Sequence, residues 1–236
     1  MLYIAARAPR PGFTKTRLGS VIGHDSAAYL YAAFLHDLAQ RFHGAPYELG
    51  WFITPPDTWP EIAPYVLSSG GFQTVIAQPD GDWTARQRAL FATMPEREED
   101  RTILIASDSP QVPIANVRHA FALLESHDLV LGPVHDGGYY LIGMRGASVC
   151  RVLDGVVMSQ GDVLAILTEQ AHRLGYSVGF TEPTFDVDEF QDLAALRTEV
   201  AIRADLRATR DALSALGLLD TVPSQRELVF AGEQPR

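Results

Sequence analysis

Short apolar runs alternate with amphipathic segments along this chain of 236 residues, and no other feature limits its fold as strongly. The runs at residues 2–6 and 101–107 have the length and apolar character of buried strands. Between them, segment 26–42 repeats apolar side chains such as Tyr31, Leu35 and Phe42 at helical spacing. Repeated alternation of this kind is typical of an α/β protein built on a mainly parallel sheet.

The remaining elements follow from the same patterns. We expect strands at residues 2–6, 47–54, 72–77, 101–107, 128–132, 139–144 and 176–180. We expect helices at residues 26–42, 60–67, 83–94, 114–126 and 163–174, and one or two more over 189–216. Because no repeat or linker interrupts this series, we predict a single domain over residues 1–222 and a loosely held tail at 223–236.

The composition indicates a protein of the cytoplasm. A hydrophobic content of 47% is enough for one sizeable core. The longest apolar runs fall far short of the ~20 residues that span a bilayer, and the N-terminus lacks the pattern of a secretion signal. The single cysteine, Cys150, excludes an internal disulfide and a Cys-rich zinc site, so we interpret it as a small core residue.

The charge is informative in both its sum and its distribution. A formal net charge of −10 argues against a nucleic-acid-binding surface, which needs a basic face. The chain has eighteen arginines but only one lysine, Lys15, which lies in the basic segment 7–17. A coding bias toward arginine would spare a lysine where a compact ammonium on a flexible stem is required. We therefore expect Lys15 to belong to a site for a small phosphorylated ligand.

Segment 7–17 is expected to form a loop that leaves the first strand. Ligands of open α/β sheets bind beyond the carboxyl ends of the strands. A loop at this place can surround phosphates with backbone N–H groups while Lys15 and Arg17 neutralise charge. It is not a P-loop, because Thr14 stands directly before Lys15 where that motif has glycine. The alternative is a Pro-rich connector with solvated charges.

Three aspartates are candidates for binding a metal ion. Asp108 follows the most apolar strand, where a carboxylate is costly unless a cation or hydrogen bonds offset its burial. Asp186 and Asp188 would point the same way in an extended segment. Hard oxygen ligands suit Mg²⁺ or Mn²⁺, so we prefer Asp108 and Asp188 as ligands and keep Asp186 as an alternative to Asp188. For either acid alone, a helix N-cap is the competing interpretation.

Segment 132–140 contains an Asp-Gly-Gly sequence at Asp136, Gly137 and Gly138. Such a sequence favours a tight turn, so a plain hairpin is one interpretation. The functional interpretation is that the glycines let the backbone approach a ligand closely, while Asp136 and Tyr139 contact its polar groups. The sequence leaves both interpretations open.

Four stretches together carry a family resemblance: residues 8–18, 107–110, 132–143 and 186–193. As an ordered set they resemble a family of uncharacterised bacterial proteins (DUF2064-type) in the nucleotide-diphospho-sugar transferase superfamily, often labelled glycosyltransferases. The resemblance implies a GT-A-type α/β fold, a three-layer sandwich in which helices flank a mainly parallel mixed sheet. It also implies a nucleotide bound over the N-terminal half of the sheet.

The basic loop is also similar to that of guanylyltransferases acting on small phosphorylated acids. In those enzymes such a loop holds a nucleoside triphosphate and pyrophosphate leaves, which favours nucleotidyl transfer here. Two positions depart from the family pattern. Arg7 stands where the family commonly has lysine, and Trp83 follows Asp82 where a further glycine is usual.

The motifs and the resemblance together predict a metal-dependent nucleotidyltransferase. It would move a nucleoside monophosphate from a triphosphate to a small phosphorylated acceptor and release pyrophosphate. A glycosyltransferase using a nucleotide sugar is the alternative enzyme, and a non-catalytic nucleotide-binding protein is the alternative from another class. The expected catalytic residues are Lys15, Arg17 and Asp108. Residues expected to contact the nucleotide or acceptor are Arg7, Pro11, Gly12, Thr16, Gly81, Asp82, Ser107, Asp136, Gly137, Gly138 and Tyr139.

Overall fold

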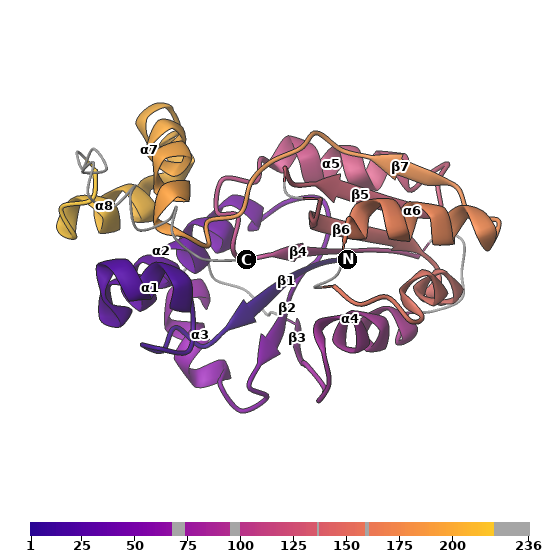
Figure 1. Cartoon of the computed structure of the whole chain (residues 1–236), viewed down its shortest axis with the longest axis horizontal. Helices are drawn as coiled ribbons and strands as arrows, with labels where there is room; N and C mark the ends of the chain where they lie inside the picture. The colour runs from indigo at the N-terminus through magenta and orange to yellow at the C-terminus, as the bar shows by residue number, and fades with distance from the viewer. Residues whose placement is uncertain (68–73, 95–99, 136, 159–160, 220–236) are drawn as a thin grey trace, which may run out of the picture.

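The computed structural model describes residues 1–67, 74–94, 100–135, 137–158 and 161–219. The tail expected at residues 223–236 lies outside these ranges, and so does Asp136. Within them, one β-sheet passes through the middle of the molecule, and helices pack on both of its faces (Figure 1).

The sheet has seven strands among the described residues, in the order β3-β2-β1-β4-β6-β5-β7. They are β1 (Leu2–Arg7), β2 (Leu49–Thr54), β3 (Thr74–Ala77), β4 (Arg101–Ala106), β5 (Leu129–Pro133), β6 (Tyr139–Arg145) and β7 (Val178–Phe180). Strand β6 runs antiparallel to β4 and β5, and the other neighbouring strands are parallel. The expected mainly parallel mixed sheet is therefore confirmed.

Helices connect most of these strands. The α-helices are α1 (Thr16–Ile22), α2 (His24–Phe42), α3 (Trp59–Val66), α4 (Trp83–Ala92), α5 (Ile114–Leu123), α6 (Val163–Arg173), α7 (Leu193–Ile202) and α8 (Arg207–Ala215). Short 3-10 segments are η2 (Ala147–Leu153), η3 (Phe190–Asp192) and η4 (Ala204–Leu206). In Figure 1, α1, α2 and α8 gather to the left of the sheet, and α4 and α6 lie to the right.

Alternate residues of the strands supply the two sides of the core. In β1, Leu2 and Ile4 pack in one hydrophobic cluster, whereas Tyr3 and Ala5 pack in the other. The first cluster contains most of the buried apolar side chains of α2, and the second contains buried apolar side chains of α4, η2 and α6. Two apolar layers on opposite faces of one sheet make the molecule a three-layer sandwich, as expected.

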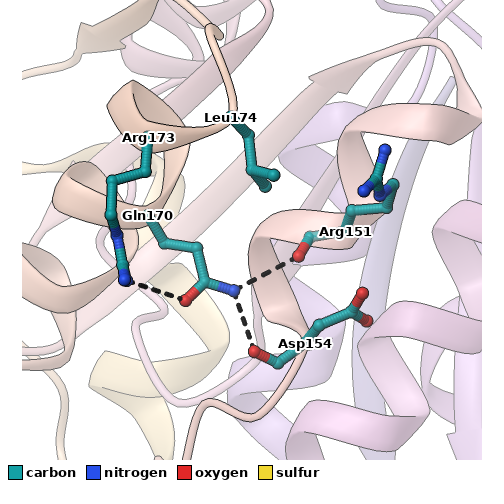
Figure 2. A pocket seen from close by; sticks show the side chains of 5 residues that line it. All are labelled: Arg151, Asp154, Gln170, Arg173 and Leu174. Atoms are coloured by element: carbon teal, nitrogen blue, oxygen red, sulfur yellow. Dashed lines mark hydrogen bonds between the residues drawn. The ribbon is translucent and has the colours of Figure 1, made fainter.

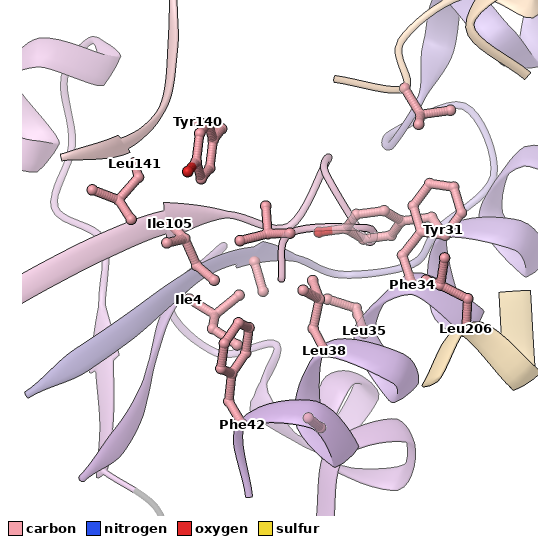
Figure 3. Close-up of a cluster of buried hydrophobic side chains, with 14 of the residues drawn as sticks. Ile4, Tyr31, Phe34, Leu35, Leu38, Phe42, Ile105, Tyr140, Leu141 and Leu206 are labelled. Carbon is pink, nitrogen blue, oxygen red and sulfur yellow. The ribbon is translucent and has the colours of Figure 1, made fainter. Parts of the chain in front are cut away.

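Helix α2 contributes a large share of the first cluster. Figure 3 shows Leu35, Leu38 and Phe42 from α2 directed toward Ile4 of β1 and Ile105 of β4. All five side chains are fully buried. Burying a side chain of this size stabilises a fold by about 1.5–3 kcal/mol, so α2 anchors the two strands whose ends carry the candidate site.

Two described elements were not expected from the sequence. Helix α1 is seven residues long and buries only Leu18 and Gly19, so it is too short to display an apolar period. Segment η2 is a 3-10 helix and lacks the α-helical spacing. The segment expected as one or two helices over 189–216 holds α7 and α8, because Arg203 adopts an extended backbone (φ −112°, ψ 116°) that ends α7.

The composition also led to expectations about Cys150 and about membrane-spanning segments. Cys150 is buried in the second cluster, as expected of a small core residue. Among the helices of the described residues, none combines the length and apolar character needed to cross a bilayer.

Candidate functional site

Lys15 lies at the centre of the candidate site. Its ammonium nitrogen Nζ is 2.6 Å from Asp108 Oδ1 and 2.8 Å from Asp188 Oδ1. The Lys15 side chain is only 3% exposed, whereas those of Asp108 and Asp188 are 42% and 49% exposed. A buried cation therefore bridges two carboxylates that themselves reach the solvent.

The sheet topology brings these groups together. Strands β1 and β4 are parallel neighbours, so the loop after β1 and Asp108 after β4 meet at the same edge of the sheet. The backbone N–H of Val187 donates to the carbonyl oxygen of Asp108 (3.0 Å), which places segment 186–188 alongside. Because the Val187 side chain is buried and side chains alternate, Asp186 and Asp188 face the opposite way, into a common pocket.

The backbone of Lys15 is unusual. Its φ angle of 49° lies in the left-handed region, which residues other than glycine seldom adopt. Helix α1 begins at the next residue, Thr16. Arg10, in the same basic loop, turns away and donates from Nε to Glu61 Oε2 of α3 (2.6 Å). The loop therefore directs Lys15 inward and Arg10 outward.

The charges of Lys15 and Asp188 stabilise each other. Burial disfavours the Lys15 ammonium, but Asp108 and Asp188 outweigh burial and raise its pKa. Burial also disfavours the Asp188 carboxylate, yet Lys15, followed by Arg17 and Arg7, lowers its pKa. Both groups are consequently charged at neutral pH.

Asp186 differs from the other two acids. Its Oδ1 accepts a hydrogen bond from the Ser109 hydroxyl, whereas the ion pairs of Lys15 are with Asp108 and Asp188. Burial raises the pKa of Asp186 to about 6, although the Ser109 hydrogen bond opposes this. Asp186 therefore ionises less readily than Asp188, two residues away.

Three adjoining pockets surround these groups. The loop pocket, of about 230 Å³, is bordered by residues that include Arg7, Phe13, Thr16, Lys15, Arg17, Asp108 and Asp188. The sheet pocket, of about 250 Å³, is bordered by Arg7, Tyr31, Gln78, Trp83, Ser107, Asp108, Tyr139 and Asp186 among others. The outer pocket, of about 330 Å³, is bordered by Arg17, His135, Asp186, Asp188, Glu189 and Gln191 among others. Shared residues join the three into one cleft.

Tyr31 is a site residue that the sequence did not reveal. Its hydroxyl accepts a hydrogen bond from the Arg7 backbone N–H (3.0 Å) and lies 2.7 Å from Ser107 Oγ. Burial raises the pKa of Tyr31 to about 12, so the hydroxyl stays neutral. The ring packs in the core beside Phe34 (Figure 3). The helical apolar period indicated this ring position but carried no sign of the hydroxyl's role.

Gln78 and Trp83 were also missed as site residues. Gln78 is buried, and its side-chain amide donates to the Phe52 carbonyl oxygen (2.8 Å) and accepts from Arg86 Nη1 (3.2 Å). Its position directly after β3 was a usable signal, because ligand-binding residues collect at the carboxyl ends of strands. Trp83 opens α4 and borders the same sheet pocket.

The structure brings nine of the expected site residues to the cleft. They are Arg7, Lys15, Thr16, Arg17, Ser107, Asp108, Tyr139, Asp186 and Asp188. The N-cap alternative does not describe the two preferred acids, because Pro113 occupies the N-cap of α5 and Glu189 that of η3. Tyr139 donates its hydroxyl to Gln87 Oε1 (3.0 Å), and burial raises its pKa.

The remaining expected residues that the structure describes do not border these pockets. Pro11 and Gly12 are exposed in the basic loop. Asp82 accepts from the Ala85 N–H (2.8 Å) and is the N-cap of α4, and Gly81 directly precedes it.

The Gly137–Gly138 turn likewise stands apart from the three pockets. Gly137 has φ 86°, and the Gly138 carbonyl oxygen accepts from the Val134 N–H (3.1 Å) across the β5–β6 turn. The hairpin interpretation therefore describes these two glycines, while Asp136 is outside the described residues.

The carboxylate pair fits a hard divalent cation in its chemistry. Asp108 and Asp188 already direct one oxygen each to the same cationic group, Lys15 Nζ. Within the described ranges, no group of three or more His, Cys, Asp or Glu side chains is arranged to hold a metal. Two carboxylates are nevertheless the usual protein contribution to a Mg²⁺ site that phosphate oxygens and water complete.

A further pocket lies away from this cleft, between η2 and α6 (Figure 2). It has a volume of about 290 Å³ and shares no bordering residue with the three pockets above. The Gln170 side-chain amide donates to the carbonyl oxygens of Asp154 (2.8 Å) and Arg151 (3.3 Å) and accepts from Arg173 (3.4 Å). The bonds from Gln170 to Arg151 and Asp154 join α6 to η2, so we interpret the polar groups of this pocket as holding the two segments together.

Solved structures place this architecture among known folds. A protein from Desulfovibrio desulfuricans, provisionally described as a nucleotide-diphospho-sugar transferase, is 28% identical, with a TM-score of 0.77 over 94% of this chain and 98% of that one. A cytidylyltransferase from Leptospira borgpetersenii is 11% identical, with a TM-score of 0.54 over 94% of this chain and 97% of that one. The fold is that of the nucleotide-diphospho-sugar transferases.

The sequence comparison adds a family. Residues 53–160 match the model of a bacterial family described as "Uncharacterized protein conserved in bacteria (DUF2064)". The resemblance to this family, expected from the sequence motifs, is thereby confirmed for the segment that holds two of the four stretches, residues 107–110 and 132–143. Among proteins with curated descriptions, none matches the chain.

Proposed function

We propose that the chain is a metal-dependent nucleotidyltransferase that moves a nucleoside monophosphate from a triphosphate to a small phosphorylated acceptor. The observation that carries this proposal is the buried Lys15 ammonium on Asp108 and Asp188, in a pocket that Arg7 and Arg17 also border. This pocket offers three positive side chains to a polyphosphate and two carboxylates to a metal ion.

The order of the three pockets supports the proposal. The sheet pocket adjoins the loop pocket at Arg7 and Asp108, and the outer pocket adjoins it at Arg17 and Asp188. We assign the nucleoside to the sheet pocket, which Trp83 and Tyr139 border, and the phosphates to the loop pocket. The acceptor would then enter the outer pocket, so that donor, reacting phosphate and acceptor follow one another along the cleft.

The chemistry requires no nucleophilic side chain. An oxygen of the acceptor phosphate forms a bond to the α-phosphorus, and the bond from that phosphorus to the α–β bridging oxygen breaks. Pyrophosphate leaves with the bonding electrons. Lys15, Arg17 and Arg7 would stabilise charge on the transferring and leaving groups, because positioning and electrostatics supply most of the rate in such reactions.

The metal is part of this proposal. Asp108 and Asp188 would hold Mg²⁺ or Mn²⁺, with Asp186 as the alternative to Asp188. When bound, the metal would neutralise phosphate oxygens. The sharing of one cation by Asp108 and Asp188 supports them as the pair, whereas the Asp186 carboxylate accepts a hydrogen bond from the Ser109 hydroxyl.

Two other functions use the same cleft. The description of the Desulfovibrio protein favours a glycosyltransferase, in which the bond broken lies at the sugar carbon and a nucleoside diphosphate leaves. The departure at Trp83 favours a nucleotide-binding protein without turnover, because an indole borders the sheet pocket where the family usually has glycine.

Thermal unfolding with a panel of nucleoside triphosphates and nucleotide sugars, each with and without Mg²⁺ or Mn²⁺, tests the proposal. A ligand at 100 times its dissociation constant stabilises the fold by about 2.7 kcal/mol. We expect metal-dependent stabilisation by one triphosphate, and release of pyrophosphate once the acceptor is found. Stabilisation by a nucleotide sugar alone would support the glycosyltransferase, and stabilisation by none of them would contradict all three functions.

A further inference from the structure

We propose that Lys15 and a divalent cation compete for the same two carboxylates, so that Lys15 must release at least one of them before a metal can bind the pair. The inference rests on the proposed function only in taking the cation to be Mg²⁺ or Mn²⁺. It assigns Lys15 a second role, that of an internal cation in the site without ligands.

The contacts of Lys15 are those of a cation on its ligands. Its Nζ lies 2.6 Å from Asp108 Oδ1 and 2.8 Å from Asp188 Oδ1, which are distances of charge-assisted hydrogen bonds. A Mg²⁺ ion held by both residues would sit about 2.0–2.1 Å from their oxygens. An ammonium and a divalent ion this close together would repel each other strongly, so they cannot both occupy the space between the carboxylates.

The burial of the three groups indicates from which side each cation reaches the carboxylates. The Lys15 side chain is 3% exposed, so it contacts the carboxylates from the protein side. Asp108 and Asp188 are about half exposed, so a metal ion would approach them from the cleft. Lys15 also borders the loop pocket with Arg7 and Arg17, where the phosphates of a nucleotide would offer its ammonium new partners.

Arg17 provides a matched control for this argument. It borders the same pocket, but its contact is with Glu189, at 3.6 Å, and its side chain is 73% exposed. Removing either positive side chain strengthens the negative field at the carboxylates. Only the removal of Lys15 also frees their oxygens.

Mn²⁺ affinity, measured by electron paramagnetic resonance without any nucleotide, tests the competition. We expect Lys15→Met to bind Mn²⁺ at least about tenfold more tightly than the wild type, because two carboxylates lose their cation. Lys15→Arg should change the affinity by less than about threefold, and so should Arg17→Met, whose charge is more exposed to solvent screening. An increase in Lys15→Met no larger than in Arg17→Met, or a decrease, would overturn the inference.

The wild-type protein allows a second test, which does not depend on how a variant folds. Lys15 is the only lysine of the chain, so protein labelled with ¹³C-lysine gives the resonances of one side chain. We expect the signal of its ε-methylene to move during titration with Mg²⁺, as the ammonium leaves a carboxylate. In protein labelled with ¹³C-aspartate as well, movement of the Asp108 and Asp188 signals with an unmoved lysine signal would overturn the inference, and so would no Mg²⁺ response of either.

These outcomes are independent of the proposed reaction. Nucleotides are absent from both experiments, so the competition can be demonstrated even if no triphosphate stabilises the protein. Conversely, nucleotide binding with no Lys15 effect on Mn²⁺ affinity would keep the proposed function and remove the competition.

Discussion

At the scale of single residues, Tyr31 connects the hydrophobic core to the candidate site through one hydroxyl group. The ring lies in the first hydrophobic cluster, and the hydroxyl contacts the Arg7 backbone N–H and Ser107 Oγ. Burial raises the pKa of Tyr31 to about 12, so the contact persists over the range in which the protein can be studied. The Tyr31 hydroxyl therefore links Arg7 at the end of β1 to Ser107 directly after β4.

Tyr31→Phe is expected to destabilise the protein by about 1–2 kcal/mol, because the Arg7 N–H and Ser107 Oγ both lose a buried partner. Urea denaturation of the wild type and the variant measures the difference. Tyr29→Phe is the matched control, since Tyr29 is 53% exposed and two residues away on α2. Its expected effect is within about 0.5 kcal/mol, and equal losses in both variants would contradict the anchoring role.

Asp205 provides a prediction about pH. Hydrogen bonds from Arg203 lower its pKa most, and Arg41 adds to this against the opposing effect of burial. An acid whose folded-state pKa lies below its unfolded value stabilises the fold above the unfolded value and loses that effect as pH falls through the folded value. Asp205→Asn should therefore be less stable than the wild type at pH 7.

The stability difference between wild type and Asp205→Asn should shrink as the pH falls below the unfolded value of about 3.9. Urea denaturation at pH 7, 5 and 3 measures it. A difference that stays constant over these three values would mean that the ion pairs of Asp205 do not contribute. Arg41 also donates to the carbonyl oxygens of Pro110 and Val112, so this cluster supports the loop that carries Asp108.

At the scale of elements, helix α8 depends on a side chain from α2. Asp37 is buried, and its two carboxylate oxygens accept from the backbone N–H groups of Ala208 (2.9 Å) and Thr209 (2.8 Å) at the start of α8. Since the first N–H groups of a helix have no partner inside it, Asp37 of α2 acts as an N-cap for α8.

Asp37→Ala is expected to cost about 1–3 kcal/mol, because two buried N–H donors would lose a charged acceptor. Thermal or urea unfolding gives the value. The exposed Asp57→Ala, in the loop after β2, serves as the control and should change stability by less than about 0.5 kcal/mol. If both substitutions have the same effect, Asp37 is not the cap of α8.

The sequence predicted elements better than contacts between them. Residues 101–107 indicated β4 by their apolar run, and the helical period of α2 was plain, whereas α1 is too short to show a period. Lys15 could be singled out because it is the only lysine. Its partner Asp188 is 173 residues away, and no local pattern encodes a contact over that separation. Trp83 was noticed only as a departure from a family pattern, because its place in a pocket depends on the tertiary fold.

At the scale of the whole molecule, the cleft exists only when the sheet is assembled. The loop after β1, the residues after β4 and segment 186–188 become neighbours through strand order and through the Val187–Asp108 hydrogen bond. A ligand that bridges these segments must bind the folded state alone. Its affinity should therefore appear directly as an increase in the unfolding temperature.

The most direct test of the central claim is the shift in unfolding temperature caused by a nucleoside triphosphate with Mg²⁺, in the wild type and in Lys15→Met. Because the shift compares each protein with and without the ligand, a change in stability caused by the substitution alone does not alter the comparison. Arg207→Met is the control, since Arg207 is 87% exposed on α8. We predict a clear shift in the wild type and the control, and a shift smaller by more than half in Lys15→Met. Equal shifts in all three proteins would contradict a nucleotide site built around Lys15.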